Sequence, residues 1–159
     1  MSRTQLVELA GRHWLTSQLL AAGLEVARPE RDHGIDLIAY LDLDEQLGDF
    51  AACPIQLKAS STSAFGLDPK YAKFRRLLIV YVWYLGDPAQ TTAYALSYQE
   101  ALTIATKMGW TKTASWITGG RHQKRGYVTN NPSGRLKELL TPFKMTPDNW
   151  RQKLVASSR

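Results

Sequence analysis

The chain contains very little cysteine and histidine. Cys53 is the single cysteine among 159 residues, so no disulfide bond can form within the chain. A lone cysteine in an apolar strand pattern is most often a small buried hydrophobe, and it suits a reducing compartment. The three histidines, His13, His33 and His122, are scattered and match no metal-ligand spacing. The sequence therefore excludes a disulfide scaffold and a zinc cluster of cysteine and histidine.

Long apolar runs and phosphate-binding loops are also missing. The longest apolar run, LLIVYVWYL at 77–85, is far too short to span a bilayer. The polar stretch at 1–13 lacks the apolar centre of a signal peptide. No glycine-rich loop follows the first predicted strand, so neither a P-loop nor a dinucleotide-binding fingerprint is present. We therefore expect a cytoplasmic protein without a membrane partner.

The chain has the composition of an ordinary globular protein, but its charged residues are distributed unevenly along the sequence. Hydrophobic residues make up 44% and charged residues 21%, which at this length predicts one domain over residues 1–159 with a real core. Residues 1–106 carry 9 Lys and Arg against 12 Asp and Glu, whereas residues 107–159 carry 11 against 2. This distribution suits an enzyme that holds cations and binds a polyanion. The alternative is a solvated basic surface without a partner.

The order of predicted elements is typical of an α/β fold with a central mixed β-sheet flanked by helices. The patterning predicts strands at 25–28, 34–41, 50–60, 76–85, 91–96 and, at an edge, 113–118, and helices at 4–22, 97–108, 133–140 and 146–156. Thr4 and Thr146 are the expected N-caps of the first and last helices. Ser97 and Glu100 form a capping box, and residues 119–126 are expected to be a basic loop.

An acidic residue interrupts the apolar strand pattern of GIDLIAY at 34–40. A carboxylate such as that of Asp36 is costly in this setting unless a partner compensates it. The strand at 50–60 carries a second polar set, because Gln56 and Lys58 share one face while Ile55 and Leu57 share the other. The acidic turn between the two strands predicts antiparallel neighbours. We therefore expect the side chains of Asp36, Gln56 and Lys58 to converge.

These three side chains have the chemistry of a site for a hard cation. A carboxylate and an amide oxygen suit Mg²⁺, which prefers oxygen ligands and keeps several waters. The ammonium of Lys58 can orient a water molecule or meet charge that develops on a phosphate. The alternative is a partly buried ion pair between Asp36 and Lys58, which would stabilise the fold poorly and would leave Gln56 unexplained.

The pattern GID at 34–36 followed by QLK at 56–58 resembles that of the PD-(D/E)XK nuclease superfamily, which has the restriction-endonuclease-like fold. The superfamily pattern places an acid at the start of one strand and acid-x-Lys on the next. The resemblance extends over about residues 4–100 in the order of elements. Two positions depart from the pattern. Ile35 stands where a proline usually precedes the acid, and Gln56 replaces the usual acid, which removes one negative charge.

The N-terminal helix of that superfamily often supplies a further glutamate, and Glu8 occupies this place. Glu8 is expected to share the apolar stripe of Leu15 and Leu19 rather than the solvent face. The alternative is an exposed Glu8 paired with Arg12, four residues later. Asp32 is interpreted as a turn residue rather than an auxiliary acid, because aspartate before glycine is common in turns.

The resemblance implies a metal-dependent endonuclease that hydrolyses DNA, of the resolvase or restriction type, with Mg²⁺ or Mn²⁺ as cofactor. It implies catalytic roles for Glu8, Asp36, Gln56 and Lys58, with the metal held by Asp36, Gln56 and Glu8. Phosphate contacts are expected from Lys112, Arg121, Lys124, Arg125, Arg135 and Lys137. Two other functions stay open: a DNA-binding module on the same fold that has lost cleavage, and an RNA-directed nuclease. The sequence also leaves open whether the chain forms a homodimer.

Overall fold

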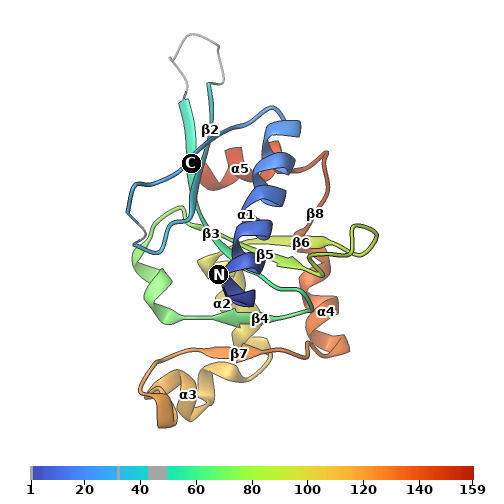
Figure 1. The fold of residues 1–159 in the computed structure, drawn as a ribbon. Coiled ribbons are helices and arrows are strands. Elements are labelled where there is room, and N and C mark those ends of the chain that lie inside the picture. Colours follow the sequence, from blue (N-terminus) through green and yellow to red (C-terminus); the bar gives the residue numbers. More distant parts are fainter. Residues whose placement is uncertain (1, 32, 43–49) are drawn as a thin grey trace.

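The computed structural model, which describes residues 2–31, 33–42 and 50–159, is an α/β structure built on a six-stranded mixed sheet (Figure 1). The strand order is β1-β2-β3-β5-β6-β8, in which β3 and β5 are parallel and the other neighbours are antiparallel. Its strands are β1 (Glu25–Ala27), β2 (Leu37–Asp42), β3 (Phe50–Ala59), β5 (Leu78–Trp83), β6 (Thr92–Ser97) and β8 (Lys144–Met145). The predicted α/β class with a central mixed sheet is therefore confirmed.

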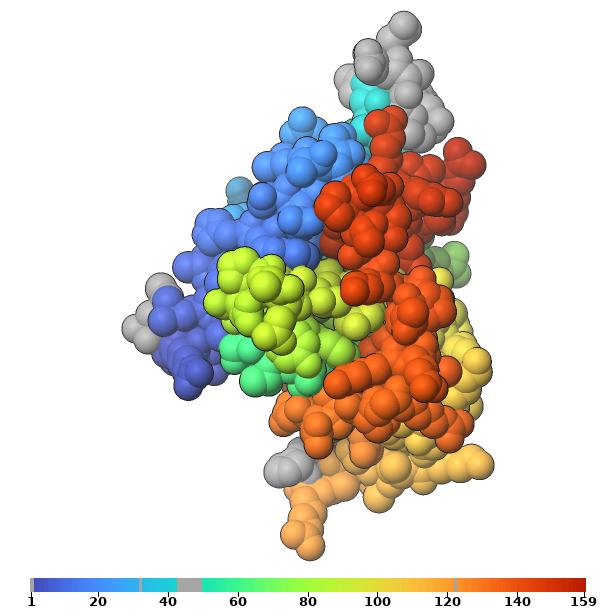
Figure 2. All heavy atoms as spheres, turned by 90° about the vertical axis from the view of Figure 1, so that its right-hand side faces the viewer, coloured from blue at the N-terminus to red at the C-terminus, as the bar shows by residue number. Residues whose placement is uncertain are grey.

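Helices cover both faces of this sheet and enclose two hydrophobic cores. The α-helices are α1 (Arg3–Ala21), α2 (Tyr98–Lys107), α3 (Ala114–Ile117), α4 (Gly134–Leu140) and α5 (Trp150–Ser158). One core joins buried side chains of α1 and α5, such as Leu15 and Leu154, to one face of the sheet. The other joins α2 and α4 to the opposite face. In Figure 2 the red C-terminal segment and the blue segment of α1 border each other on one surface.

A second, two-stranded sheet lies below the main one and was not predicted. It pairs β4 (Phe65–Leu67) with β7 (Tyr127–Thr129) and lies at the lower end of the molecule in Figure 1. Two buried aromatic side chains of β5 attach β4 to the main sheet. The hydroxyl of Tyr81 donates to the carbonyl of Gly66 at 2.6 Å, and the indole of Trp83 donates to the carbonyl of Ala64 at 2.7 Å. These bonds satisfy polar groups that burial would otherwise leave unpaired.

The N-terminal helix α1 lies unusually close to β3. A Cβ atom on Gly11 would stand 2.6 Å from the Cβ of Ala59, so only glycine permits this approach. The N-cap of the helix lies two residues earlier than predicted, because Ser2 and not Thr4 caps it. Ser2 forms a capping box with Gln5, which satisfies two free N–H groups of the first turn.

Other boundaries were predicted with mixed success. The capping box of Ser97 and Glu100 at the start of α2 is confirmed. The predicted edge strand at 113–118 is wrong, since Thr113 instead caps the short helix α3. Thr146 is not the N-cap of α5, which begins at Trp150 after Asn149. Within the described ranges, no helix is long and apolar enough to cross a membrane.

Candidate functional site

The four predicted catalytic residues line one cavity of about 640 Å³. Asp36 comes from the residue before β2, Gln56 and Lys58 from β3, and Glu8 from α1. The cavity lies between the main sheet, α1 and the β4–β7 pair, because residues 64–68 and 124–128 form its other walls. The structure therefore brings together residues that are separated by as many as 50 positions in the sequence.

The antiparallel pairing of β2 with β3 explains how Asp36 meets Gln56. Leu37 is opposite Ile55 in the register, and the N–H of Asp36 continues the ladder by donating to the carbonyl of Ile55 at 2.8 Å. The strand was predicted to begin at Gly34, whereas β2 begins at Leu37, so Asp36 lies at the strand end rather than within it. The acid at the start of the strand therefore faces the polar side of β3.

Asp36 and Gln56 are joined directly. The Gln56 Nε2 amide donates to Asp36 Oδ2 at 2.6 Å, and the Leu57 N–H donates to the same oxygen at 2.6 Å. Gln56 Nε2 also donates to the carbonyl of Leu57 at 3.2 Å. Hydrogen bonds of this kind to a carboxylate are shorter and stronger than those between neutral groups. They fix the orientation of the Asp36 carboxylate at the edge of the cavity.

One polar atom at this site has no partner in the described part of the chain. Gln56 is 8% exposed, and its Oε1 atom is buried and accepts no hydrogen bond. A buried acceptor without a partner costs about 1–3 kcal/mol, which a cation or a bound water would recover. The oxygen and nitrogen of an amide exchange places on a half-turn of the side chain, so the amide can present its oxygen beside Asp36 instead. The donor set of a carboxylate, an amide oxygen and a nearby glutamate fits Mg²⁺ or Mn²⁺.

A group of three or more His, Cys, Asp or Glu side chains that could hold a metal is not found within residues 2–31, 33–42 and 50–159. The Asp36–Gln56 pair is a different kind of site, because one of its two oxygen-bearing side chains is an amide. Asp32, which was interpreted as a turn residue, lies outside the described residues. The fit of a metal to the site therefore depends on Asp36, Gln56 and Glu8.

Lys58 is held by a residue that the sequence did not indicate. Its Nζ donates to the hydroxyl of Tyr71 at 2.9 Å. The same Nζ lies 5.1 Å from the centroid of the Tyr71 ring, within range of a cation–π contact. Tyr71 is 2% exposed and belongs to the 3-10 helix η1 (Pro69–Lys73), whose N-cap is Asp68. The Asp68-Pro69 pair was the available sequence signal, since it starts a helical turn.

The phenol of Tyr71 stays neutral at physiological pH. Burial raises the pKa of Tyr71 above its ordinary value, and the nearby ammonium of Lys70 offsets only part of this effect. A neutral acceptor orients the Lys58 ammonium without cancelling its charge. An ammonium held in this way is suited to meet negative charge in the cavity.

Glu8 lines the cavity, but its side chain is more exposed than the sequence suggested. Glu8 is exposed, whereas Leu15 and Leu19 are fully buried, so the expectation that Glu8 is turned away from solvent is wrong. Arg12, one turn later, lines the same cavity.

The predicted DNA-binding residues divide into two groups. All six are exposed, and Lys124 and Arg125 line the cavity, where the Nε of Arg125 also donates to the carbonyl of Trp116 at 3.0 Å. The other four, Lys112, Arg121, Arg135 and Lys137, do not line it. Trp110 and Trp116 are 6% and 8% exposed and pack in the core, so neither is available to stack on a base.

Comparison with known protein families, curated proteins and solved structures finds no match to this chain. The functional argument therefore depends on the cavity and its side chains.

Proposed function

We propose that this chain is a metal-dependent endonuclease that hydrolyses DNA phosphodiester bonds. The observation that supports this most is the meeting of Asp36, Gln56 and Lys58 at the ends of two adjacent strands, in one cavity with Glu8. A purely structural arrangement would not require a carboxylate, an amide and an ammonium to line the same hollow. Catalytic sites are where such costly polar groups gather.

The charge of the cavity supports a polyanionic substrate. Among its lining residues, five are basic and three are acidic. The basic residues are Arg12, Lys58, Lys70, Lys124 and Arg125, and the acidic ones are Glu8, Asp36 and Asp68. Two of the three acids, Glu8 and Asp36, belong to the proposed metal site, and the bases line the same cavity. This arrangement suits a phosphodiester whose reacting group lies at the acids while its flanking phosphates meet the bases.

Each residue has a distinct role in this proposal. Asp36 and Gln56, with Glu8, would hold Mg²⁺ or Mn²⁺, which when bound would supply an acidified water and neutralise phosphate charge. Asp36 keeps its orientation through the Leu57 N–H. Lys58 meets the charge that grows on the non-bridging phosphate oxygens as water adds to phosphorus. One P–O bond forms to the water oxygen, one P–O ester bond breaks, and the leaving oxygen receives a proton.

The test is nicking of supercoiled plasmid by purified protein in Mg²⁺, in Mn²⁺ and in EDTA. The wild type is expected to nick only with metal. Asp36→Asn and Lys58→Ala are expected to lose at least about 10²-fold in rate, because each removes a group that acts in the transition state. Asp148→Asn is the matched control, since Asp148 is exposed and does not line the cavity. Equal nicking by wild type and Asp36→Asn would refute the proposal.

A DNA-binding module without cleavage is the second candidate, and one observation favours it. Gln56 Nε2 satisfies Asp36 Oδ2 at 2.6 Å, so the carboxylate has a neutral protein partner where the superfamily pattern has a second acid. A site with an amide in place of the second carboxylate has one negative charge fewer and therefore binds a metal cation less strongly. Binding of duplex DNA at wild-type level by Asp36→Asn, with no metal-dependent nicking by the wild type, would establish this alternative.

A further inference from the structure

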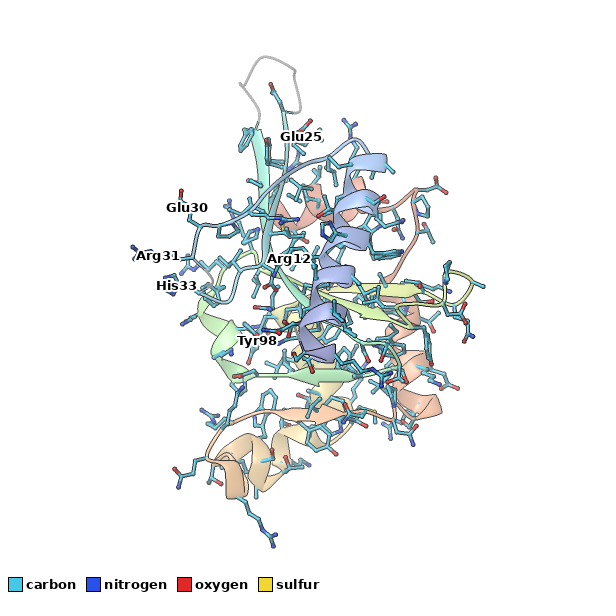
Figure 3. All side chains as sticks on the ribbon, viewed as in Figure 1. Arg12, Glu25, Glu30, Arg31, His33 and Tyr98 are labelled. Atoms are coloured by element: carbon cyan, nitrogen blue, oxygen red, sulfur yellow. The ribbon has the colours of Figure 1, made fainter. Side chains whose placement is uncertain are left out.

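Arg12 is a basic residue of the cavity that the close packing of α1 on β3 brings into place. It follows Gly11, whose missing side chain allows α1 to lie against Ala59 at the end of β3. Lys58 precedes Ala59 in β3, so the contact places Arg12 beside the strand that carries Gln56 and Lys58. Figure 3 labels Arg12 on the flank of α1 that is turned toward the segment leading into β2. Arg12 also lines a second hollow of about 370 Å³ together with Glu8, so it lies where two hollows meet.

The guanidinium of Arg12 lacks the partners that such a group normally has. Its Nε is buried and has no hydrogen-bond partner in the described part of the chain. Within residues 2–31, 33–42 and 50–159, Arg12 takes part in neither ion pair that the structure shows, Lys70 with Asp68 or Lys153 with Glu100, so Arg12 is not paired with Glu8. A guanidinium stays charged at every physiological pH, and a buried donor without an acceptor costs about 1–3 kcal/mol. A bound anion would remove this cost.

We propose that Arg12 binds a backbone phosphate of the nucleic acid in this cavity, next to the phosphate at Asp36 and Lys58. This inference rests on the proposed function for the identity of the ligand. The fork of donors on a guanidinium matches the oxygens of a phosphate, which two of its N–H groups can contact at once. Arg12 approaches from α1, and Lys124 and Arg125 approach from the opposite wall. Bases on both walls suit a chain of phosphates better than a single small anion.

The other interpretation is that Arg12 only packs its alkyl stem against the helix and the sheet. Long basic side chains often cover apolar surface while the charged end stays in water. The missing acceptor for the buried Nε argues against this interpretation, because packing of the stem alone would leave that donor unsatisfied. The two interpretations predict different effects of salt, since only a phosphate contact releases counterions when it forms.

The experiment measures binding of a fluorescently labelled 20-base-pair duplex by anisotropy, in EDTA and over a range of salt concentrations. Arg12→Met keeps the length of the stem and removes the charge. It is expected to weaken binding about tenfold and to lower the log–log salt slope by about 0.9, the value for one phosphate contact. Arg12→Lys is expected to keep the slope and to lose part of the affinity, because an ammonium cannot form the bidentate contact.

Arg151→Met is the control, because Arg151 is exposed on α5 and does not line the cavity. Melting temperatures of all variants show whether the fold survives. A salt slope for Arg12→Met equal to that of Arg151→Met would overturn the inference, whatever the change in affinity. Because no metal is present, the result does not depend on cleavage. A flattened slope with no nicking by the wild type would support the phosphate site and refute the nuclease.

Discussion

The Gln56 side chain bridges two strands by donating its amide to Asp36 Oδ2 at 2.6 Å. The acceptor is a carboxylate, and the donor stands where the PD-(D/E)XK pattern has a second carboxylate. Two carboxylates at this distance would repel each other unless a cation lay between them or one took up a proton. Glutamine therefore lets the Asp36 side chain keep its orientation without a metal. The cost is that the site has one negative charge fewer with which to attract a cation.

We expect Gln56→Glu to make the fold dependent on a divalent cation. In EDTA at neutral pH the variant replaces a charge-assisted hydrogen bond with a repulsive pair, so unfolding should become easier by about 2 kcal/mol, or roughly 5 °C in melting temperature. Saturating Mg²⁺ should recover most of this loss. Thermal melts with and without Mg²⁺ measure both effects. Gln152→Glu, at an exposed position of α5, is the control. A variant that melts like the wild type in EDTA would contradict the expected repulsion.

The features of the fold that the sequence predicted correctly depend on residues close together in the chain. The alternation along β3 predicted that Gln56 and Lys58 lie on one face of the strand and Ile55 on the other. The acidic turn predicted that β2 and β3 are antiparallel neighbours. The capping box at Ser97 is equally local, because both its hydrogen bonds lie within one turn. Such features depend on neighbours in the chain, so the sequence carries them directly.

The parts that the sequence could not predict depend on distant contacts. The pairing of β4 with β7 joins residues about sixty positions apart, and three-residue strands have too little pattern to be recognised. Tyr71 lies between two predicted strands, and its hydrogen bond with Lys58 joins residues 13 positions apart, so no local pattern predicts it. The role of Gly11 is visible only when Ala59 lies against it. Each case requires the tertiary structure.

The structure separates the basic residues that we expect to contact DNA from those that we do not. Lys124 lines the cavity, whereas Lys137 lies on α4 and does not. Lys124→Ala should lower the log–log salt slope of duplex binding by about 0.9, and Lys137→Ala should change it much less. Anisotropy titrations at several salt concentrations give both slopes. Equal slopes for the two variants would show that the cavity wall is not the DNA-binding surface.

An ion pair between α2 and α5 should make part of the stability depend on pH. Lys153 Nζ lies 2.8 Å from Glu100 Oε2, and Ser97 N–H also donates to that carboxylate. Burial alone would raise the pKa of Glu100, but these hydrogen bonds outweigh it and hold the pKa below its ordinary value. The contribution is therefore present above the unfolded pKa and is lost as the pH falls through the lower, folded pKa.

Glu100→Gln should remove this acid-dependent part of the stability. The pair is partly exposed, so the expected loss at pH 7 is below about 1 kcal/mol. Urea denaturation at pH 7 and at pH 3 measures it, and the variant should lose less stability between the two pH values than the wild type. Glu138→Gln, at an exposed position of α4, provides the reference. A pH dependence identical to the wild type would show that the pair contributes nothing to it.

Tyr71 offers the sharpest test of how Lys58 acts. Its hydroxyl accepts the Lys58 hydrogen bond at 2.9 Å, and Tyr71→Phe removes that oxygen while it keeps the buried ring. If Tyr71 works by orienting Lys58, the plasmid-nicking kcat of Tyr71→Phe should fall about tenfold with little change in KM, as expected for a hydrogen bond to a charged group.

The decisive comparison uses the Lys58→Ala background. There Tyr71 has no ammonium to orient, so Tyr71→Phe should cause no further loss of nicking. A tyrosine that only supports the fold would instead lower the rate by the same factor with or without Lys58, and melting temperatures would fall in parallel. Nicking rates and melting curves for the wild type, both single variants and the double variant complete the cycle. Equal factors in the two backgrounds would contradict the orienting role, and a coupling of about tenfold would show that Tyr71 acts through Lys58.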